Sequence, residues 1–111
     1  MPNRIDKILK QFIQEVSQLL GKRLKQIILY GSYARGDYDN NSDIDIMILT
    51  DLDEQEIIKY RMKIRDLACD LELDNDITIS PLLRNFQKYN DRKDIIPFYM
   101  NIQKEGVILH G

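Results

Sequence analysis

Two aspartates, separated by a single residue, lie in an otherwise apolar stretch of the chain. The segment 43–50 is DIDIMILT, so Asp43 and Asp45 lie among Ile, Met and Leu. On a β-strand, residues two apart point to the same face, which predicts that both carboxylates share one face of a sheet. Two carboxylates this close repel one another unless a cation lies between them, and oxygen ligands suit Mg²⁺. The pair therefore predicts a divalent metal site.

A third carboxylate follows later in the chain. Asp76 opens the segment DITIS, which is typical of a strand. A strand beside that of Asp43 and Asp45 would bring Asp76 to the same end of the sheet. Three acidic groups can hold two metal ions about 3.5–4 Å apart, an arrangement that serves displacement at phosphorus. Asp74 is an alternative to Asp76, because both have the same parity in the run DLELDND.

A Gly-Ser pair precedes the aspartates and has the chemistry to bind phosphate. Gly31 directly follows the apolar run LKQIILY, and glycine lets another group approach the backbone closely. Ser32 offers a hydroxyl and an amide, and Arg35 lies one helical turn later, where it would add a charge-assisted hydrogen bond. The alternative for Arg35 is a structural salt bridge. The chain has no Walker A pattern. Phosphate donors at one strand end and metal carboxylates on the next predict nucleoside triphosphate chemistry.

The elements that would position these residues predict an α/β (α+β) fold in a single domain, 1–111, with a small mixed central sheet flanked by helices. The stretch QKYNDRKD, 87–94, is polar and rich in Asn and Asp, and no helix or strand is assigned to it. The predicted elements, in chain order, are a helix over 3–20, a strand over 24–30, one helical turn at 32–35, a strand over 43–50, a helix capped by Asp53 and Glu56, a strand over 76–80 closed by Pro81, a short helix over 95–104 and a last strand at 107–109.

The composition restricts the class of protein. Lys and Arg total 16 and Asp and Glu total 18, so a sequence-independent nucleic-acid binder is not indicated, and nucleic acid is not expected as the substrate. No apolar run approaches the roughly 20 residues that cross a bilayer, and the charged N-terminal segment has no signal-peptide core. We therefore expect a cytoplasmic protein with no membrane contact. The single cysteine, Cys69, cannot form an internal disulfide, and we expect it on the buried face of a helix.

The order and spacing of these motifs resemble the DNA polymerase β-type nucleotidyltransferase superfamily. Gly31-Ser32 is followed by ten residues and then by Asp43-x-Asp45, and the Ala-Arg-Gly after the serine is similar to the minimal nucleotidyltransferase (MNT) group. The resemblance implies the nucleotidyltransferase fold, with ATP as the nucleotide donor and Mg²⁺, in two ions, as the cofactor. It implies that Asp43, Asp45 and Asp76 are catalytic and bind metal, with Asp76 as the base, and that Gly31 and Ser32 hold the triphosphate.

The resemblance also implies a partner. Small chains that resemble MNT proteins are commonly paired with an all-helical HEPN protein in toxin–antitoxin systems. The function implied is that of a protein adenylyltransferase (AMPylase) antitoxin, which transfers AMP to a tyrosine of a HEPN RNase toxin. Because 111 residues leave no room for a separate acceptor domain, we expect the acceptor to be another protein. Two alternatives are a small-molecule (antibiotic-type) nucleotidyltransferase and a non-catalytic antitoxin that neutralises its partner by binding alone.

Overall fold

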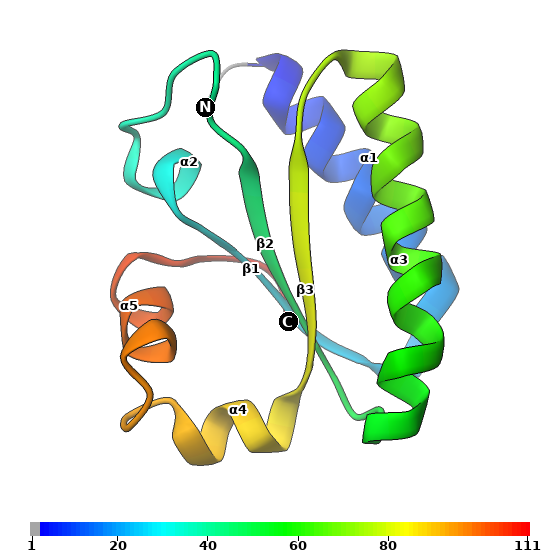
Figure 1. Ribbon diagram of the computed structural model, residues 1–111, viewed down its shortest axis with the longest axis vertical. Coiled ribbons are helices and arrows are strands. Elements are labelled where there is room, and N and C mark those ends of the chain that lie inside the picture. The colour runs from blue at the N-terminus through cyan, green and yellow to red at the C-terminus, as the bar shows by residue number, and fades with distance from the viewer. Residues whose placement is uncertain (1–2) are drawn as a thin grey trace.

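The computed structural model describes residues 3–111 and consists of a four-stranded sheet with helices on both sides (Figure 1). In chain order, the elements are α1 (Asn3–Leu20), a 3-10 turn (Gly21–Arg23), β1 (Leu24–Tyr30), α2 (Ser32–Arg35), β2 (Ile44–Thr50), α3 (Glu54–Asn75), β3 (Ile79–Asn85), α4 (Phe86–Arg92), α5 (Pro97–Glu105) and β4 (Val107–His110). Within this part of the chain, every helix is too short or too polar to span a bilayer.

The sheet is mixed, as the short connection between the first two strands predicts. Its strand order is β3-β2-β1-β4, with β1 antiparallel to both β2 and β4, and β2 parallel to β3. In the register of these strands, Asp45 lies opposite Tyr30 on β1 and beside Ser80 on β3. The first aspartate of the pair, Asp43, comes immediately before β2.

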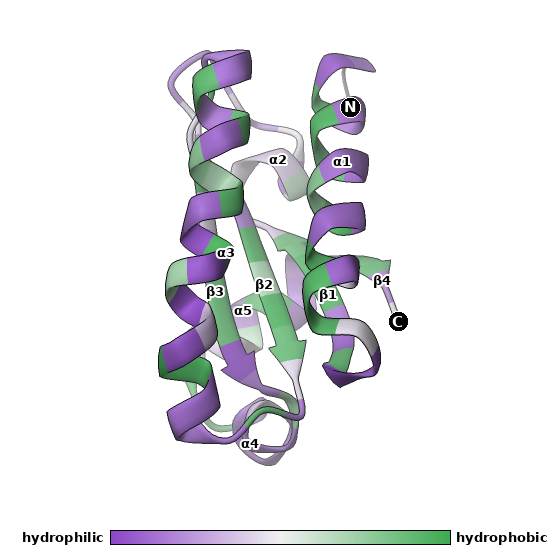
Figure 2. Ribbon diagram, turned by 90° about the vertical axis from the view of Figure 1, so that its right-hand side faces the viewer, coloured by the Kyte–Doolittle hydropathy of each residue, from purple (hydrophilic) through white to green (hydrophobic). Residues whose placement is uncertain are grey.

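Side chains of β2 alternate between two apolar clusters, which fixes the face on which Asp45 stands. Ile44, Ile46 and Ile48 belong to the main core, which α1 and α3 cover. Met47 and Leu49 belong to a smaller cluster with residues of α4 and α5. Figure 2 shows α1 and α3 in front of the sheet and α5 behind it. Asp45 has the parity of Met47 and Leu49, so it stands on the less covered face.

The two long helices agree with the predicted pattern. In α1, apolar residues recur at helical spacing and their side chains are buried, among them Ile5, Phe12 and Val16. The second long helix, α3, begins at a capping box: the Asp53 carboxylate accepts from the Glu56 backbone N–H, and the Glu56 carboxylate accepts from the Asp53 N–H. The helix continues to Asn75, so the acidic run near its end is helical.

The third strand differs from its prediction. It spans Ile79–Asn85 rather than 76–80, and Pro81 lies inside it instead of closing it. Because β3 is an edge strand, Pro81 can face outward, where its missing N–H removes no bond to β2. Asp76 precedes the strand and ends α3 in the left-handed conformation, with φ of 50°.

One stretch without an assigned element proved to be helical, and the expectation for Cys69 was wrong. The polar stretch 87–94 is mostly helical, because Asn85 caps α4 by accepting from the Lys88 N–H and because Tyr89 is buried. Cys69 is exposed rather than buried, since its side chain points away from the face of α3 that contains Ala68 and Leu71.

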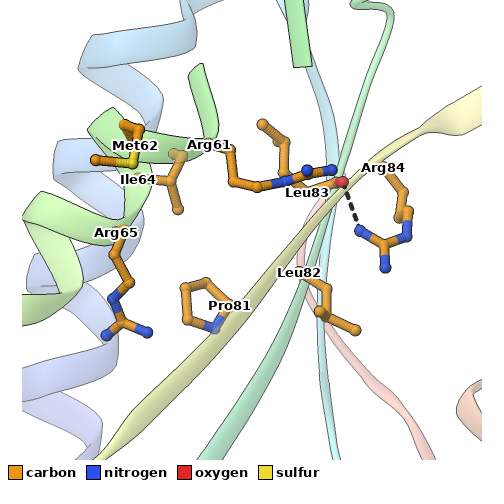
Figure 3. Close-up of a pocket in the computed structure, with 8 residues that line it drawn as sticks. All are labelled: Arg61, Met62, Ile64, Arg65, Pro81, Leu82, Leu83 and Arg84. Carbon is orange, nitrogen blue, oxygen red and sulfur yellow. Dashed lines mark hydrogen bonds between the residues drawn. The ribbon is translucent and has the colours of Figure 1, made fainter. Parts of the chain in front are cut away.

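Side chains also protect the free edge of β3, and Figure 3 shows part of this edge, with Pro81 and the bond from Arg84 to Leu83. The backbone N–H of Ile79 donates to Glu72, and its carbonyl accepts from Arg65 at 3.2 Å. Further along the edge, Pro81 has no N–H, and the Leu83 carbonyl accepts from Arg84 at 2.9 Å. A further strand would need these same backbone groups, so strand addition at this edge is disfavoured.

Candidate functional site

The two aspartates lie where β2 begins. Asp43 is exposed and Asp45 is half-buried. Burial raises the pKa of the Asp45 carboxyl, and the nearby negative charge of Asp43 raises it further. Glu105 acts in the same direction, whereas the guanidinium of Arg35 lowers this pKa. Because the surroundings disfavour the ionised form of Asp45, a cation that binds there would stabilise the carboxylate.

The Gly-Ser motif packs directly against Asp45. Gly31 has φ of 77° and ψ of −157°, a backbone conformation that is essentially restricted to glycine. A β-carbon at residue 31 would overlap Oδ2 of Asp45 and would lie 3.2 Å from its Cγ. The end of β1 and the start of β2 therefore approach one another at a point where a side chain on residue 31 would have to displace the Asp45 carboxylate.

The ten residues between the motifs form an ordered connection. The carbonyl of Gly31 accepts from the N–H groups of Ala34 and Arg35 at 3.1 and 3.0 Å, which forms the short helix α2. After α2, Asp39 and Ser42 close a turn through two hydrogen bonds of 2.9 and 3.1 Å, and the chain then enters β2. The predicted helical turn at 32–35 is confirmed.

Arg35 lies at this site with two carboxylate partners. Its Nε donates to Asp37 at 3.1 Å and its Nη1 donates to Glu105 at 3.0 Å. The structural salt bridge that was the alternative for Arg35 is thus present. Within residues 3–111, the Nη2 group of Arg35 makes no hydrogen bond, so this nitrogen remains able to donate to an anion.

Glu105 is a residue of this site that no sequence motif indicates. This residue ends α5, and its Oε1 accepts from the backbone N–H of Gly31 at 3.1 Å, while Oε2 binds Arg35. In Figure 1, α2 and the connection from α5 to β4 both lie at the left of the picture. Gly31 and Glu105 are 74 residues apart in the chain, and no motif or spacing links them.

Asp76 is at the same end of the sheet as Asp43 but apart from the pair. It is exposed and borders a polar cavity of about 380 Å³. Ser80, not Asp76, is the β3 residue beside Asp45. Among residues 3–111, no group of three or more His, Cys, Asp or Glu side chains is placed to hold a metal ion. The other residues that line the cavity are Asn40, Asn41, Ser42, Glu72, Ile77 and Thr78.

The pair of carboxylates nevertheless suits one Mg²⁺ ion. This ion prefers oxygen ligands, keeps several waters and is usually bound by one or two carboxylates together with phosphate oxygens of a substrate. Asp43 and Asp45 supply such a donor set, and the raised pKa of Asp45 is the property that a bound cation would offset. The residues present therefore fit a metal that is completed by the substrate.

An aromatic pair lies next to the acidic residues. Tyr30 is opposite Asp45 across the strands and is buried, and its ring meets that of Phe98 edge to face with 5.6 Å between centroids. Burial, and then the charge of Asp45, raises the pKa of Tyr30 to about 12. Phe98 is 43% exposed, so the acidic site has a partly open apolar border.

Comparison with known proteins gives related sequences. A model of the nucleotidyltransferase domain family matches residues 9–104. Two relatives from Methanocaldococcus jannaschii are named "Putative protein adenylyltransferase", MJ0604 and MJ0141. MJ0604 is 35% identical over 95% of this chain and 97% of its own length. MJ0141 is 43% identical over 71% of this chain and 78% of its own length.

Solved structures with a similar fold are more distant in sequence. A nucleotidyltransferase structure from Sulfolobus solfataricus, itself described as putative, aligns with 95% of this chain and 80% of its own, with a TM-score of 0.61 and 22% identity. A crystal structure described as a toxin–antitoxin with AMP-PNP aligns with 99% of this chain and 74% of its own, with a TM-score of 0.57 and 22% identity. At this identity, the likeness establishes the fold.

Proposed function

The chain belongs to the nucleotidyltransferase domain family, and we propose that it is a protein adenylyltransferase that moves AMP from ATP to a hydroxyl group of a partner protein. The observation that carries the proposal is the contact between the Gly31 backbone and the Asp45 carboxylate. This contact joins a phosphate-binding turn to a metal-binding pair. Relatives that match nearly the whole chain are named for the same activity, which supports the choice of acceptor class.

In the proposed reaction, the oxygen of the acceptor hydroxyl forms a bond to the α-phosphorus of ATP. The bond between that phosphorus and the oxygen that bridges to the β-phosphate breaks, and pyrophosphate leaves with the electron pair. Gly31 and Ser32 hold the triphosphate, and Arg35 contributes its Nη2 group to a phosphate oxygen. Reactions of this kind need little covalent chemistry from the protein, since positioning and charge stabilisation supply most of the rate enhancement.

Asp43 and Asp45 would hold Mg²⁺ in this site. When bound, the ion neutralises charge on the phosphate oxygens and orients the α-phosphate. The protein's own contribution is to keep Asp45 on the less covered face of β2, beside the turn that begins at Gly31, with Asp43 immediately before the strand. Because the described residues offer two grouped carboxylates rather than three, the remaining ligands would come from nucleotide and water.

We propose Asp76 as the group that accepts the hydroxyl proton. It lies at the same end of the sheet as Asp43 and borders the polar cavity that Ser42, the neighbour of Asp43 in the chain, also lines. An acceptor hydroxyl that enters this cavity would meet the Asp76 carboxylate. Asp74 is the alternative. It is exposed in the last turn of α3 and does not line this cavity.

The proposed partner is an all-helical HEPN-type RNase toxin, modified on a tyrosine, with this chain as its antitoxin. Support comes from the resemblance of the Gly31–Asp45 segment to MNT proteins and from the similar fold in a structure described as a toxin–antitoxin with AMP-PNP. A tyrosine hydroxyl fits the partly open aromatic border that Tyr30 and Phe98 form next to Asp45.

The acceptor class is tested by supplying ATP labelled in its α-phosphate together with Mg²⁺. The reactions contain either the protein encoded beside this one or a panel of aminoglycosides and other small hydroxyl compounds. Label on the protein supports the proposal, and label only on small molecules overturns it in favour of the antibiotic-type alternative. If no label is transferred but the Asp43→Asn/Asp45→Asn variant still neutralises the toxin, the binding-only alternative holds.

A further inference from the structure

One carboxylate connects two parts of the phosphate-binding turn. Oε1 of Glu105 accepts from the Gly31 backbone N–H at 3.1 Å, and Oε2 accepts from Nη1 of Arg35 at 3.0 Å. The two bonds begin at the first residue of the turn and at the last residue of α2. Because both end on the same rigid carboxylate group, they fix the distance and orientation between these two residues.

The residue that supplies this carboxylate is itself firmly placed. Gly106 follows it, and the Gly106 N–H donates to the Ile102 carbonyl at 2.7 Å. A β-carbon at residue 106 would lie 2.7 Å from Cγ2 of Ile28, so this turn packs against β1. Val107 then pairs with Leu29. Glu105 is therefore held between α5 and the sheet, and its side chain is only 23% exposed.

Arg35 keeps N–H donors that are not used by its bonds to Glu105 and Asp37. A guanidinium has five N–H groups in a planar fork. Asp37 takes Nε and Glu105 takes Nη1, and within residues 3–111 the Nη2 group has no partner. The carboxylates of Asp37 and Glu105 together fix the orientation of the guanidinium plane. Binding of a phosphate oxygen to Nη2 then costs little additional side-chain entropy.

We propose that Glu105 is a positioning residue for nucleotide binding, which orients Arg35 and the Gly31–Ser32 backbone toward the triphosphate. The inference deepens the proposed function and rests on its nucleotide-binding step. Glu105 does not contact the nucleotide in this arrangement. It acts through the two groups that do, and its negative charge keeps the guanidinium in place until a phosphate arrives.

A competing arrangement makes the opposite prediction. If the Glu105 carboxylate occupies the place of a phosphate oxygen, ATP must displace it, and removal of its charge would strengthen nucleotide binding. In the positioning role, removal of the charge weakens binding. The direction of the change therefore separates the two arrangements.

The test compares Glu105→Gln with the matched variant Glu54→Gln, which removes an exposed glutamate charge from an ion pair with Lys88 in the first turn of α3. Affinity for Mg²⁺ and α,β-methylene-ATP is measured by calorimetry, and kcat and KM for ATP are measured with the partner. We expect Glu105→Gln to weaken nucleotide binding and raise KM about tenfold, the effect of losing one charge-assisted hydrogen bond, with a smaller change in kcat. Glu54→Gln should match the wild type.

Two further readouts keep the test independent of overall stability. Glu105→Asp retains the charge on a shorter side chain and should restore part of the affinity. Hydrogen exchange of the Gly31 amide should accelerate in Glu105→Gln relative to Glu54→Gln. Unchanged or tighter nucleotide binding in Glu105→Gln overturns the inference, and so does a wild-type protein that binds no nucleotide. If nucleotide binding depends on Glu105 but no AMP reaches a partner protein, the inference stands and the proposed function fails.

Discussion

The carboxylate of Asp45 occupies the space that a β-carbon on residue 31 would need, so Gly31 and Asp45 define the centre of the site. The backbone of Gly31 adopts a conformation that is open essentially to glycine alone. The two motifs are therefore in contact, and the turn between them ends where the Asp43–Asp45 pair begins. A substitution at either residue should alter the other.

The first prediction concerns the size of residue 31. Gly31→Ala adds a methyl group that must displace the Asp45 side chain, in addition to the backbone strain of a positive φ. Gly36→Ala is the matched control, because Gly36 has φ of 88° and open space around it. We expect Gly36→Ala to lower the free energy of unfolding by about 1–2 kcal/mol and to leave nucleotide binding intact. Gly31→Ala should cost more and abolish nucleotide binding, as measured by urea unfolding and calorimetry. Equal effects of the two variants would contradict the contact.

The second prediction concerns the charge of Asp45. The folded state raises the pKa of this carboxyl, chiefly through burial, so its ionisation opposes folding above that pKa. Asp45→Asn should therefore raise the melting temperature at neutral pH when Mg²⁺ is removed by a chelator. The gain should shrink as the pH falls through the raised pKa of Asp45 in the folded protein, and it should vanish below the pKa of an unfolded aspartate, because the carboxyl is then neutral in both states. Added Mg²⁺ should stabilise the wild type and leave Asp45→Asn unchanged, and a lower melting temperature for Asp45→Asn in chelator would count against this account.

A third prediction distinguishes Asp76 from Asp74. If Asp76 accepts the hydroxyl proton, Asp76→Asn should lower kcat by about 10²–10⁴-fold, with little effect on nucleotide affinity. Asp74→Asn should be close to wild type. The reverse pattern would assign the role to Asp74, and activity in both variants would show that neither carboxylate serves as the base.

The fourth prediction concerns the stability of the domain in acid. Hydrogen bonds from Arg23, and then from the Asp53 backbone, lower the pKa of Glu56 from its usual 4.5 to about 2. A depressed pKa means that this stabilisation is fully present above about pH 4.5 and is lost as the pH falls toward 2. Arg23→Gln removes the main cause of the lowered pKa, so less stabilisation is available to be lost in acid. The melting temperature of this variant should therefore fall less steeply than that of the wild type over this pH range. Lys22→Gln, a neighbouring charge change, should retain the wild-type slope.

The central motif was predictable because its chemistry is local. Alternation along a strand placed Asp45 on a different face from Ile44 and Ile46, and the structure has that arrangement. Glycine after an apolar strand predicted a close approach, and the group that approaches proved to be Asp45. Both inferences depend only on residues a few positions apart.

The parts that failed depend on contacts across the chain. Proline is rare inside a central strand, so Pro81 predicted the end of the strand. Pro81 is tolerated inside β3 because β3 is at the edge of the sheet, a position that the sequence does not reveal. Asp76 was assigned to a strand, although helix α3 runs on to Asn75. Glu105 was missed because it reaches the site from α5, next to a strand that pairs with β1. No spacing in the sequence encodes that proximity.

The most direct test of the account is the mass of the partner protein after incubation with this protein, ATP and Mg²⁺. Wild-type protein should add the mass of one or more adenylate groups to the partner, and tandem mass spectrometry should place them on a tyrosine. The Asp43→Asn/Asp45→Asn variant, confirmed as folded by circular dichroism, should add none. An unmodified partner with the wild type, or equal modification with the double variant, would contradict the assignment of Asp43 and Asp45 as the centre of an adenylyl-transfer site.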